Sequence, residues 1–281
     1  MSGRPLIHRR RLRARPGRSA ARVVVLLVVA LFVFLQGRRA KERRSSRADP
    51  DPGRVVTTGS PGGKYVPAGD EGLGAAVAIM VDNSGSMREA AKGDTRPKFE
   101  VARLALEQML ASTDSFAAKQ PGFPIKVGVY YFSSAVRPLI QMQPYNAAAV
   151  RTALESMPPP SGGTAIGKAM DLARQELYAS GVIRKYILVV TDGENTDGRA
   201  PRDVAREIAD RSEGAVRMYF VAFDIDAQKF SFLHDVHGEV LGADNAVGLR
   251  ASLDTIYRGR ILAEAVDAGE TLTPPTPTKK P

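Results

Sequence analysis

Cysteine is absent from the 281-residue sequence. Its absence excludes a disulfide scaffold, a cysteine-ligated zinc site, an iron–sulfur cluster and a cysteine nucleophile. A Walker A phosphate-binding loop is also missing at residues 62–64 (Gly-Gly-Lys), because Thr58 stands where that motif needs glycine and Tyr65 where it needs serine or threonine. The composition is otherwise that of a globular protein, with 43% hydrophobic and 25% charged residues. This composition excludes a chain that is disordered throughout.

Positive charge is concentrated at the N-terminus. The net charge is +10, yet residues 1–47 hold thirteen Arg and one Lys against one Glu, which gives +13. The remaining residues carry 26 basic and 29 acidic side chains, so they are mildly acidic at −3. A nucleic-acid-binding domain would place its basic residues on a folded face, whereas these flank an apolar run. We therefore expect no nucleic-acid partner.

That apolar run covers residues 23–35, and eight arginines precede it. Its length and basic flank fit a secretory signal peptide, whose apolar region has about 7–15 residues. Extended to residues 19–37, the segment is also long enough for an uncleaved signal-anchor, with Arg22 reaching the headgroups. Residues 36–38 (Gln-Gly-Arg) offer no small-x-small cleavage site, which favours the anchor. We predict a single-pass membrane protein whose C-terminal domain is extracytoplasmic, in the periplasm or at the cell surface.

The chain beyond the basic N-terminus (1–47) divides by composition. Residues 48–72 are rich in Ser, Pro, Gly and Asp, which is typical of a flexible linker. Residues 268–281 carry four prolines and are predicted to form a short disordered tail. Residues 73–267 remain as one globular domain.

Within this domain, short apolar runs alternate with segments whose apolar residues recur at helical spacing. Since strands that alternate with helices form a mostly parallel sheet covered on both faces, the fold class is α/β. The segment 135–142 is separated from the strand predicted at 125–132 by only two residues, too few for a crossover helix. It is therefore predicted to be an antiparallel edge strand. Strands are predicted at 75–81, 125–132, 135–142, 186–190, 216–223 and 239–241, and helices at 98–112, 146–157, 165–178, 202–212 and 246–265.

Oxygen-bearing side chains cluster at three loops of this pattern. The first strand runs into Asp82-Asn83-Ser84-Gly85-Ser86, Ser161-Gly162-Gly163-Thr164 precedes a helix, and Thr191-Asp192-Gly193 follows the strand at 186–190. Gly85, Gly162 and Gly163 suit loops that need unusual backbone angles or close approach to an ion. In parallel sheets, ligands bind at the carboxyl ends of strands. Carboxylate and hydroxyl oxygens suit Mg²⁺, Mn²⁺ or Ca²⁺ better than Zn²⁺ or Cu²⁺, and two carboxylates leave such an ion able to accept an anionic oxygen from a partner.

With these motifs in this order, residues 73–265 resemble the von Willebrand factor A domain family. The resemblance implies a Rossmann-like, doubly wound sheet of five parallel strands and one antiparallel edge strand, between two layers of helices. It also implies that Ser84, Ser86 and Thr164 contact a metal ion directly, that Asp82 and Asp192 act mainly through water, and that an acidic residue of a protein partner completes the coordination. These five residues match, one by one, the family's metal-ion-dependent adhesion site.

The stretches VDNSGSM, KFEVARLAL, GGTAIGKAM and VVTDGENTDG look most like bacterial members of the family encoded beside ATPases, including the Bat aerotolerance type. Many of those members are tethered to a membrane. The resemblance therefore implies a membrane-anchored, non-enzymatic module for Mg²⁺-dependent protein–protein interaction, which includes complexes with other membrane or ATPase-associated proteins.

An enzyme is the main alternative, since a Mg²⁺ site at strand ends would also suit a hydrolase or a phosphoryl-transfer enzyme. The motifs supply no histidine, lysine or cysteine as nucleophile or general base, and Lys168, one turn into a helix, is more simply a solvent-facing side chain. For Asp82 and Asp192 the structural alternative is helix capping or loop hydrogen bonding.

Two further groups of polar residues have both a functional and a structural interpretation. His234 and His237 stand three residues apart and could belong to a second metal site, although ordinary polar histidines are far commoner. Glu194, Asn195 and Asp197 would either shape a partner surface or form a solvated loop.

Overall fold

The computed structural model describes residues 71–264. The predicted membrane segment, almost all of the predicted linker and the predicted tail lie outside these residues. Within residues 71–264, no helix has both the length and the apolar character needed to cross a membrane.

Six strands form one sheet in the order β3-β2-β1-β4-β5-β6. Every neighbouring pair is parallel except β2 and β3, which are antiparallel. The chain runs from β1 outward to β3 on one side and then crosses back to β4 on the other, so the strand order reverses at β1. The predicted doubly wound sheet with one antiparallel edge strand is confirmed. The strands are β1 (Gly72–Asp82), β2 (Ile125–Phe132), β3 (Val136–Pro144), β4 (Val182–Thr191), β5 (Val216–Phe223) and β6 (Glu239–Ala243).

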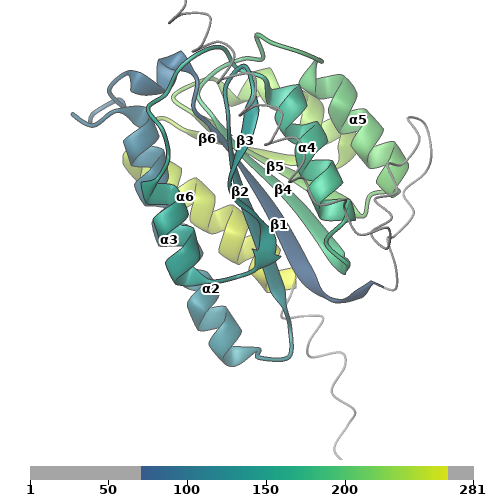
Figure 1. Ribbon diagram of the computed structural model, residues 1–281. Helices are drawn as coiled ribbons and strands as arrows, with labels where there is room; N and C mark the ends of the chain where they lie inside the picture. Colours follow the sequence, from purple (N-terminus) through teal and green to yellow (C-terminus); the bar gives the residue numbers. More distant parts are fainter. Residues whose placement is uncertain (1–70, 265–281) are drawn as a thin grey trace, which may run out of the picture. The chain divides into compact units, whose positions relative to one another are not determined.

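Helices cover both faces of the sheet, as Figure 1 shows. One face packs against α2 (Lys98–Lys119), α3 (Ala147–Glu155) and α6 (Ala246–Ile256). The other packs against α4 (Ile166–Tyr178), α5 (Pro201–Ser212) and the 3₁₀ segment η2 (Ala227–Val236), which the sequence pattern did not predict. A shorter 3₁₀ turn, η1 (Gly85–Arg88), follows β1, and the π-helical η3 (Tyr257–Leu262) continues α6.

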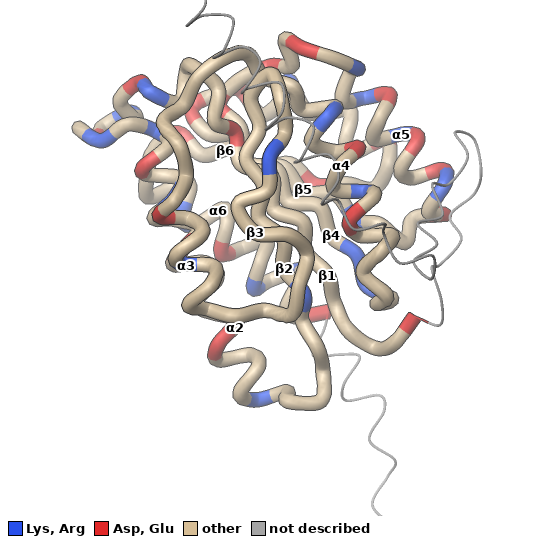
Figure 2. Tube along the Cα trace, in the orientation of Figure 1, with Lys and Arg blue, Asp and Glu red and all other residues tan. Residues whose placement is uncertain are grey.

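The centre of the sheet is buried on both faces, as the apolar run at 75–81 predicts. Side chains of β1 alternate between the two layers: Val77 and Ile79 lie in one core cluster, whereas Ala78 and Met80 lie in the other. All of residues 75–81 are fully buried, and each large apolar side chain among them contributes about 1.5–3 kcal/mol of transfer free energy. Figure 2 shows Lys, Arg, Asp and Glu mainly on the helices and loops around this core. The carboxyl end of β1 is therefore held in a rigid frame.

Candidate metal site

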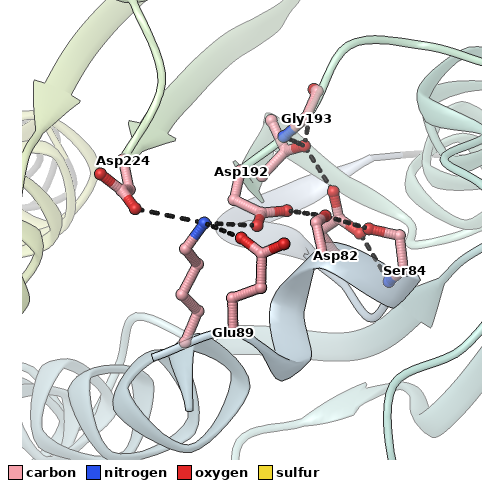
Figure 3. Close-up of polar contacts among 9 residues, drawn as sticks. Asp82, Ser84, Glu89, Asp192, Gly193 and Asp224 are labelled. Carbon is pink, nitrogen blue, oxygen red and sulfur yellow. Dashed lines mark hydrogen bonds and ion pairs between the residues drawn. The ribbon is translucent and has the colours of Figure 1, made fainter. Parts of the chain in front are cut away.

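The three predicted motifs meet at the carboxyl edge of the sheet. Asp82 is the last residue of β1, and Asp192 directly follows β4, the strand paired with β1. The Ser84 and Ser86 hydroxyl oxygens lie 3.1 Å apart, and Ser86 donates a hydrogen bond of 2.8 Å to Asp192 Oδ1. Figure 3 shows Asp82, Ser84 and Asp192 gathered at this point. Two carboxylates and two hydroxyls from distant parts of the sequence thus converge.

Asp82 is buried and held by neutral donors only. Its Oδ1 accepts from the backbone N–H of Ser84 at 2.8 Å, and its Oδ2 accepts from the Thr191 hydroxyl at 2.6 Å. Burial raises the pKa of Asp82 to about 6, although these hydrogen bonds oppose the increase. The bond to Ser84 is the loop-capping contact of the structural alternative. No cation of the described chain pairs with this carboxylate, so its charge is left for another ligand to balance.

Thr164 is placed by a second set of loop contacts. Its backbone N–H donates to the Thr196 hydroxyl, and its carbonyl accepts from the backbone N–H of Thr196, both at 2.8 Å. The loop before Thr164 is joined to the β1 loop, since Gly85 N–H donates to the Gly162 carbonyl at 3.0 Å. A Cβ on Gly193 would lie 3.5 Å from the Thr164 hydroxyl, which places that hydroxyl beside the Asp192 loop.

Of Gly85, Gly162 and Gly163, only Gly162 has the expected unusual backbone angle. Gly162 has a φ of +82°, and a Cβ on Gly163 would come within 2.8 Å of the Thr196 hydroxyl. Gly85 has no positive φ, and a Cβ there would make only an ordinary contact at 3.5 Å with the Gly162 carbonyl. The close approach therefore belongs to the loop that carries Thr164.

Asp192 differs from Asp82 because a lysine neutralises it. Lys98, the first residue of α2, is only 5% exposed. Its ammonium lies 3.1 Å from Asp192 Oδ2, 3.2 Å from Asp224 Oδ2 and 3.5 Å from Glu89 Oε2, and Figure 3 traces these three ion pairs. Burial alone would lower the pKa of Lys98, but its contacts with Asp192 and Asp224 outweigh burial and raise that pKa.

Lys98 was not among the sequence-predicted site residues. One signal could have indicated it, because a lysine at the first position of a helix opposes the helix dipole and needs a local reason. Thr191 and Thr196 were also missed, since a threonine beside a motif looks like any other loop residue until its partner is known.

The polar residues after Asp192 make contacts within the domain. Glu194 forms an ion pair with Lys229, and Asp197 lies 3.2 Å from the ammonium of Lys168. Asn195 accepts a hydrogen bond of 3.3 Å from the backbone N–H of Gly167. These contacts order the loop that follows Asp192.

His234 and His237 are exposed, and His237 ends η2. Residues 71–264 contain no group of three or more His, Cys, Asp or Glu side chains placed to hold a metal ion. Both histidines thus lie at the surface of the domain.

The donor set at the carboxyl edge suits a hard divalent cation. The five predicted side chains supply carboxylate and hydroxyl oxygens, which are the ligands that Mg²⁺, Mn²⁺ and Ca²⁺ prefer. Asp82, Ser84, Thr164 and Asp192 are buried, and Ser86 is partly exposed. The cluster therefore comes nearest to the surface at Ser86.

The model of the von Willebrand factor type A domain matches residues 76–240 of the chain. No curated protein matches the chain in sequence. Similar solved structures include BatB from Bacteroides thetaiotaomicron, with 21% identity, a TM-score of 0.52 and coverage of 68% of this chain and 100% of that chain. An aerotolerance-related membrane protein from Bacteroides fragilis has 18% identity, a TM-score of 0.52 and coverage of 66% and 100%.

The PilB minor pilin from Streptococcus sanguinis has 14% identity and a TM-score of 0.57. The match covers 71% of this chain and 64% of the pilin, so the chain spans less than two thirds of the pilin's length. At these identities the three structures show a shared fold.

Proposed function

Because the chain belongs to the von Willebrand factor type A domain family, whose members typically mediate protein–protein interactions, we propose that it binds a protein partner through a divalent metal ion. Asp82, Ser84, Ser86, Thr164 and Asp192 would hold the ion, and a carboxylate of the partner would complete its coordination. The proposal assigns Mg²⁺ as the ion, with Mn²⁺ or Ca²⁺ able to replace it.

The uncompensated charge of Asp82 is the observation that carries this proposal. Its carboxylate is fully buried, receives only neutral hydrogen bonds, and has a pKa raised to about 6. A buried carboxylate without a counter-charge is costly. A divalent ion beside Ser84 and Ser86 would supply that charge and would favour the ionised form of Asp82.

A cleft at the carboxyl edge of the sheet carries one more cation than carboxylates, which favours an acidic partner. This cleft of about 750 Å³ lies between the loop before α2 and the start of α6, and its charged lining residues are Lys92, Arg96 and Arg250 together with Asp94 and Asp244. Arg96 is paired with Asp94 at 2.5 Å. Lys92 and Arg250 form no ion pair with the part of the chain that the structure describes, so both are available to further carboxylates of an acidic segment.

The N-terminal segment supplies the second part of the proposal. The apolar run at 23–35 and its flanking arginines would anchor the chain in a membrane, and the domain would face the periplasm or the cell surface. A reporter fused to the C-terminus tests this topology: alkaline phosphatase should be active there. An active cytoplasmic reporter at the same position would contradict it.

Metal binding is tested by titrating Mg²⁺ into the full chain by calorimetry and Mn²⁺ by electron paramagnetic resonance, in a mild detergent. The Asp82→Ala variant should lose binding. Asp244→Asn is the matched control, because Asp244 is an exposed acidic residue just after β6, at the same edge of the sheet. Equal binding by wild type and Asp82→Ala would refute the site. The titration is repeated with acetate, which stands in for the partner's carboxylate.

A further inference from the structure

We infer that Lys98 is the resident counter-cation of this site: its ammonium balances Asp192 in the metal-free protein and thereby weakens the hold of the site on a divalent ion. The inference rests on the proposed metal site and adds a residue that regulates it. It predicts that the site is built to stand empty and to keep its ion only when a partner carboxylate adds a further negative charge.

The position of Lys98 is fixed from both its backbone and its side chain. Its backbone N–H donates to the Glu89 carbonyl at 2.8 Å, which fixes the start of α2. Its ammonium then reaches three carboxylates from three separate loops, those of Glu89, Asp192 and Asp224. The ammonium of Lys98 thereby joins the loops that follow β1, β4 and β5.

The two oxygens of Asp192 face different partners. Oδ2 faces the Lys98 ammonium, and Oδ1 accepts from the Ser86 hydroxyl. An ion held by the hydroxyls of Ser84 and Ser86 would therefore share the Asp192 carboxylate with the ammonium. The Asp192 side chain is fully buried and that of Lys98 is 7% exposed, so solvent screens the repulsion between the two cations only weakly.

The carboxylates of Asp224 and Glu89 give the ammonium alternative partners. The Asp224 side chain is 27% exposed and that of Glu89 is 71% exposed. When an ion and a partner carboxylate bind, the ammonium can strengthen its contact with these two groups and weaken its contact with Asp192. The same lysine thus lowers the affinity for the ion without blocking its binding.

Lys98→Met tests the inference, because methionine retains most of the length of the side chain and removes the charge. In EDTA the variant should unfold on the order of 10 °C below wild type, since Asp192 is left buried without a counter-charge. Mn²⁺ should bind about tenfold more tightly than to wild type and should recover much of the lost thermal stability. Both quantities are measured on the full chain, by circular dichroism and by electron paramagnetic resonance.

Two matched variants separate this effect from general damage. Lys185→Met removes the other buried lysine of the described residues, which lies six positions before Thr191 in β4 and thus about 20 Å along the strand from the site. It should lower stability but leave the Mn²⁺ affinity at the wild-type value. Asp224→Asn should shift the ammonium toward Asp192 and weaken Mn²⁺ binding about threefold, more than Asp244→Asn does.

Failure of the inference is distinguishable from failure of the proposed function. If wild type binds Mn²⁺ and Lys98→Met binds it equally or more weakly, the lysine only positions Asp192, and the metal site stands. If neither protein binds Mn²⁺ with or without acetate, both proposals are wrong. If Lys98→Met binds Mn²⁺ without acetate, whereas wild type binds it only with acetate, the inference is supported. If Lys98→Met does not fold in EDTA, the Asp224→Asn variant decides. A Mn²⁺ affinity of Asp224→Asn that is no weaker than that of Asp244→Asn would overturn the inference.

Discussion

Each end of the sheet contains one buried lysine, and the two have different surroundings. Lys185, near the amino end of β4, is 1% exposed; its ammonium donates to the Val182 carbonyl at 2.6 Å and pairs with Glu71, which precedes β1. Lys98, at the carboxyl end, is 5% exposed and lies among the carboxylates of three loops. The first lysine ties two neighbouring strands together, whereas the second balances charge at a site.

The contrast shows how the domain can have a rigid end and an adaptable end. The ammonium of Lys185 contacts backbone carbonyls of its own strand and the Glu71 carboxylate, so little can change there without unfolding. The contacts of Lys98 are shared among groups of different exposure, and one of them, Asp192, belongs to the candidate metal site. A bound ion would therefore redistribute the contacts of Lys98 and leave those of Lys185 as they are.

The largest expected effect sharpens the difference between the two ends. Asp82→Ala should weaken Mn²⁺ binding by about a hundredfold, because it removes a buried carboxylate that would hold the ion mainly through water. Glu71→Gln, a change of one negative charge at the opposite end, should leave binding unchanged. Mn²⁺ titration monitored by electron paramagnetic resonance checks both variants. A loss of binding in Glu71→Gln of similar size would show that only the total charge of the domain matters.

The second prediction concerns the rigid end alone. Lys185→Met should lower the free energy of unfolding by about 3 kcal/mol, since it removes one partner of a buried ion pair. Urea unfolding followed by circular dichroism measures this change. The stabilisation by Mn²⁺ should equal that of wild type, and a larger gain in the variant would break the proposed separation of the two ends.

The third prediction uses pH. The pKa of Asp82 is about 6 in the folded chain against 3.8 as an ordinary value, so between these values the folded protein holds the extra proton. Its stability in EDTA therefore falls as pH rises through this range, and wild type should be about 1 kcal/mol more stable at pH 5 than at pH 7 through this group. Asp82→Asn should lack this increment. With saturating Mn²⁺ the dependence should reverse, because the ion binds the ionised carboxylate; urea unfolding at the two pH values measures both trends.

The smallest expected effect concerns the Thr164 loop. Thr196→Ala removes the hydroxyl that accepts from the Thr164 backbone N–H, and it should weaken Mn²⁺ binding about threefold to tenfold through poorer placement of Thr164. The matched control is Thr255→Ala on the exposed side of α6, whose hydroxyl bonds only to the carbonyl one turn earlier among the described residues. Equal affinities in the two variants would show that the loop needs no such support.

The sequence was most informative where side chains are mainly apolar. Residues 125–132 and 216–223 were predicted with their observed bounds, because each is a mostly apolar segment of strand length in which Lys126 and Arg217 are the only charged residues. The strand β4 begins at Val182 instead of the predicted 186, since Arg184 and the buried Lys185 interrupt the apolar pattern. The segment η2 was missed because its buried residues, including Phe230 and Leu233, follow the spacing of a short 3₁₀ stretch.

The candidate site also has one part that the sequence predicts and one part that only the tertiary structure shows. The sequence by itself determined that Asp82, Ser84, Ser86 and Asp192 share one edge, because each follows a parallel strand and parallel strands end on the same side. Only the tertiary structure decided which of the two carboxylates has a counter-charge. Lys98 lies 94 positions from Asp192 in the sequence, and their ion pair depends on how α2 packs against the sheet. A charge that is balanced across such a distance has no local pattern to reveal it.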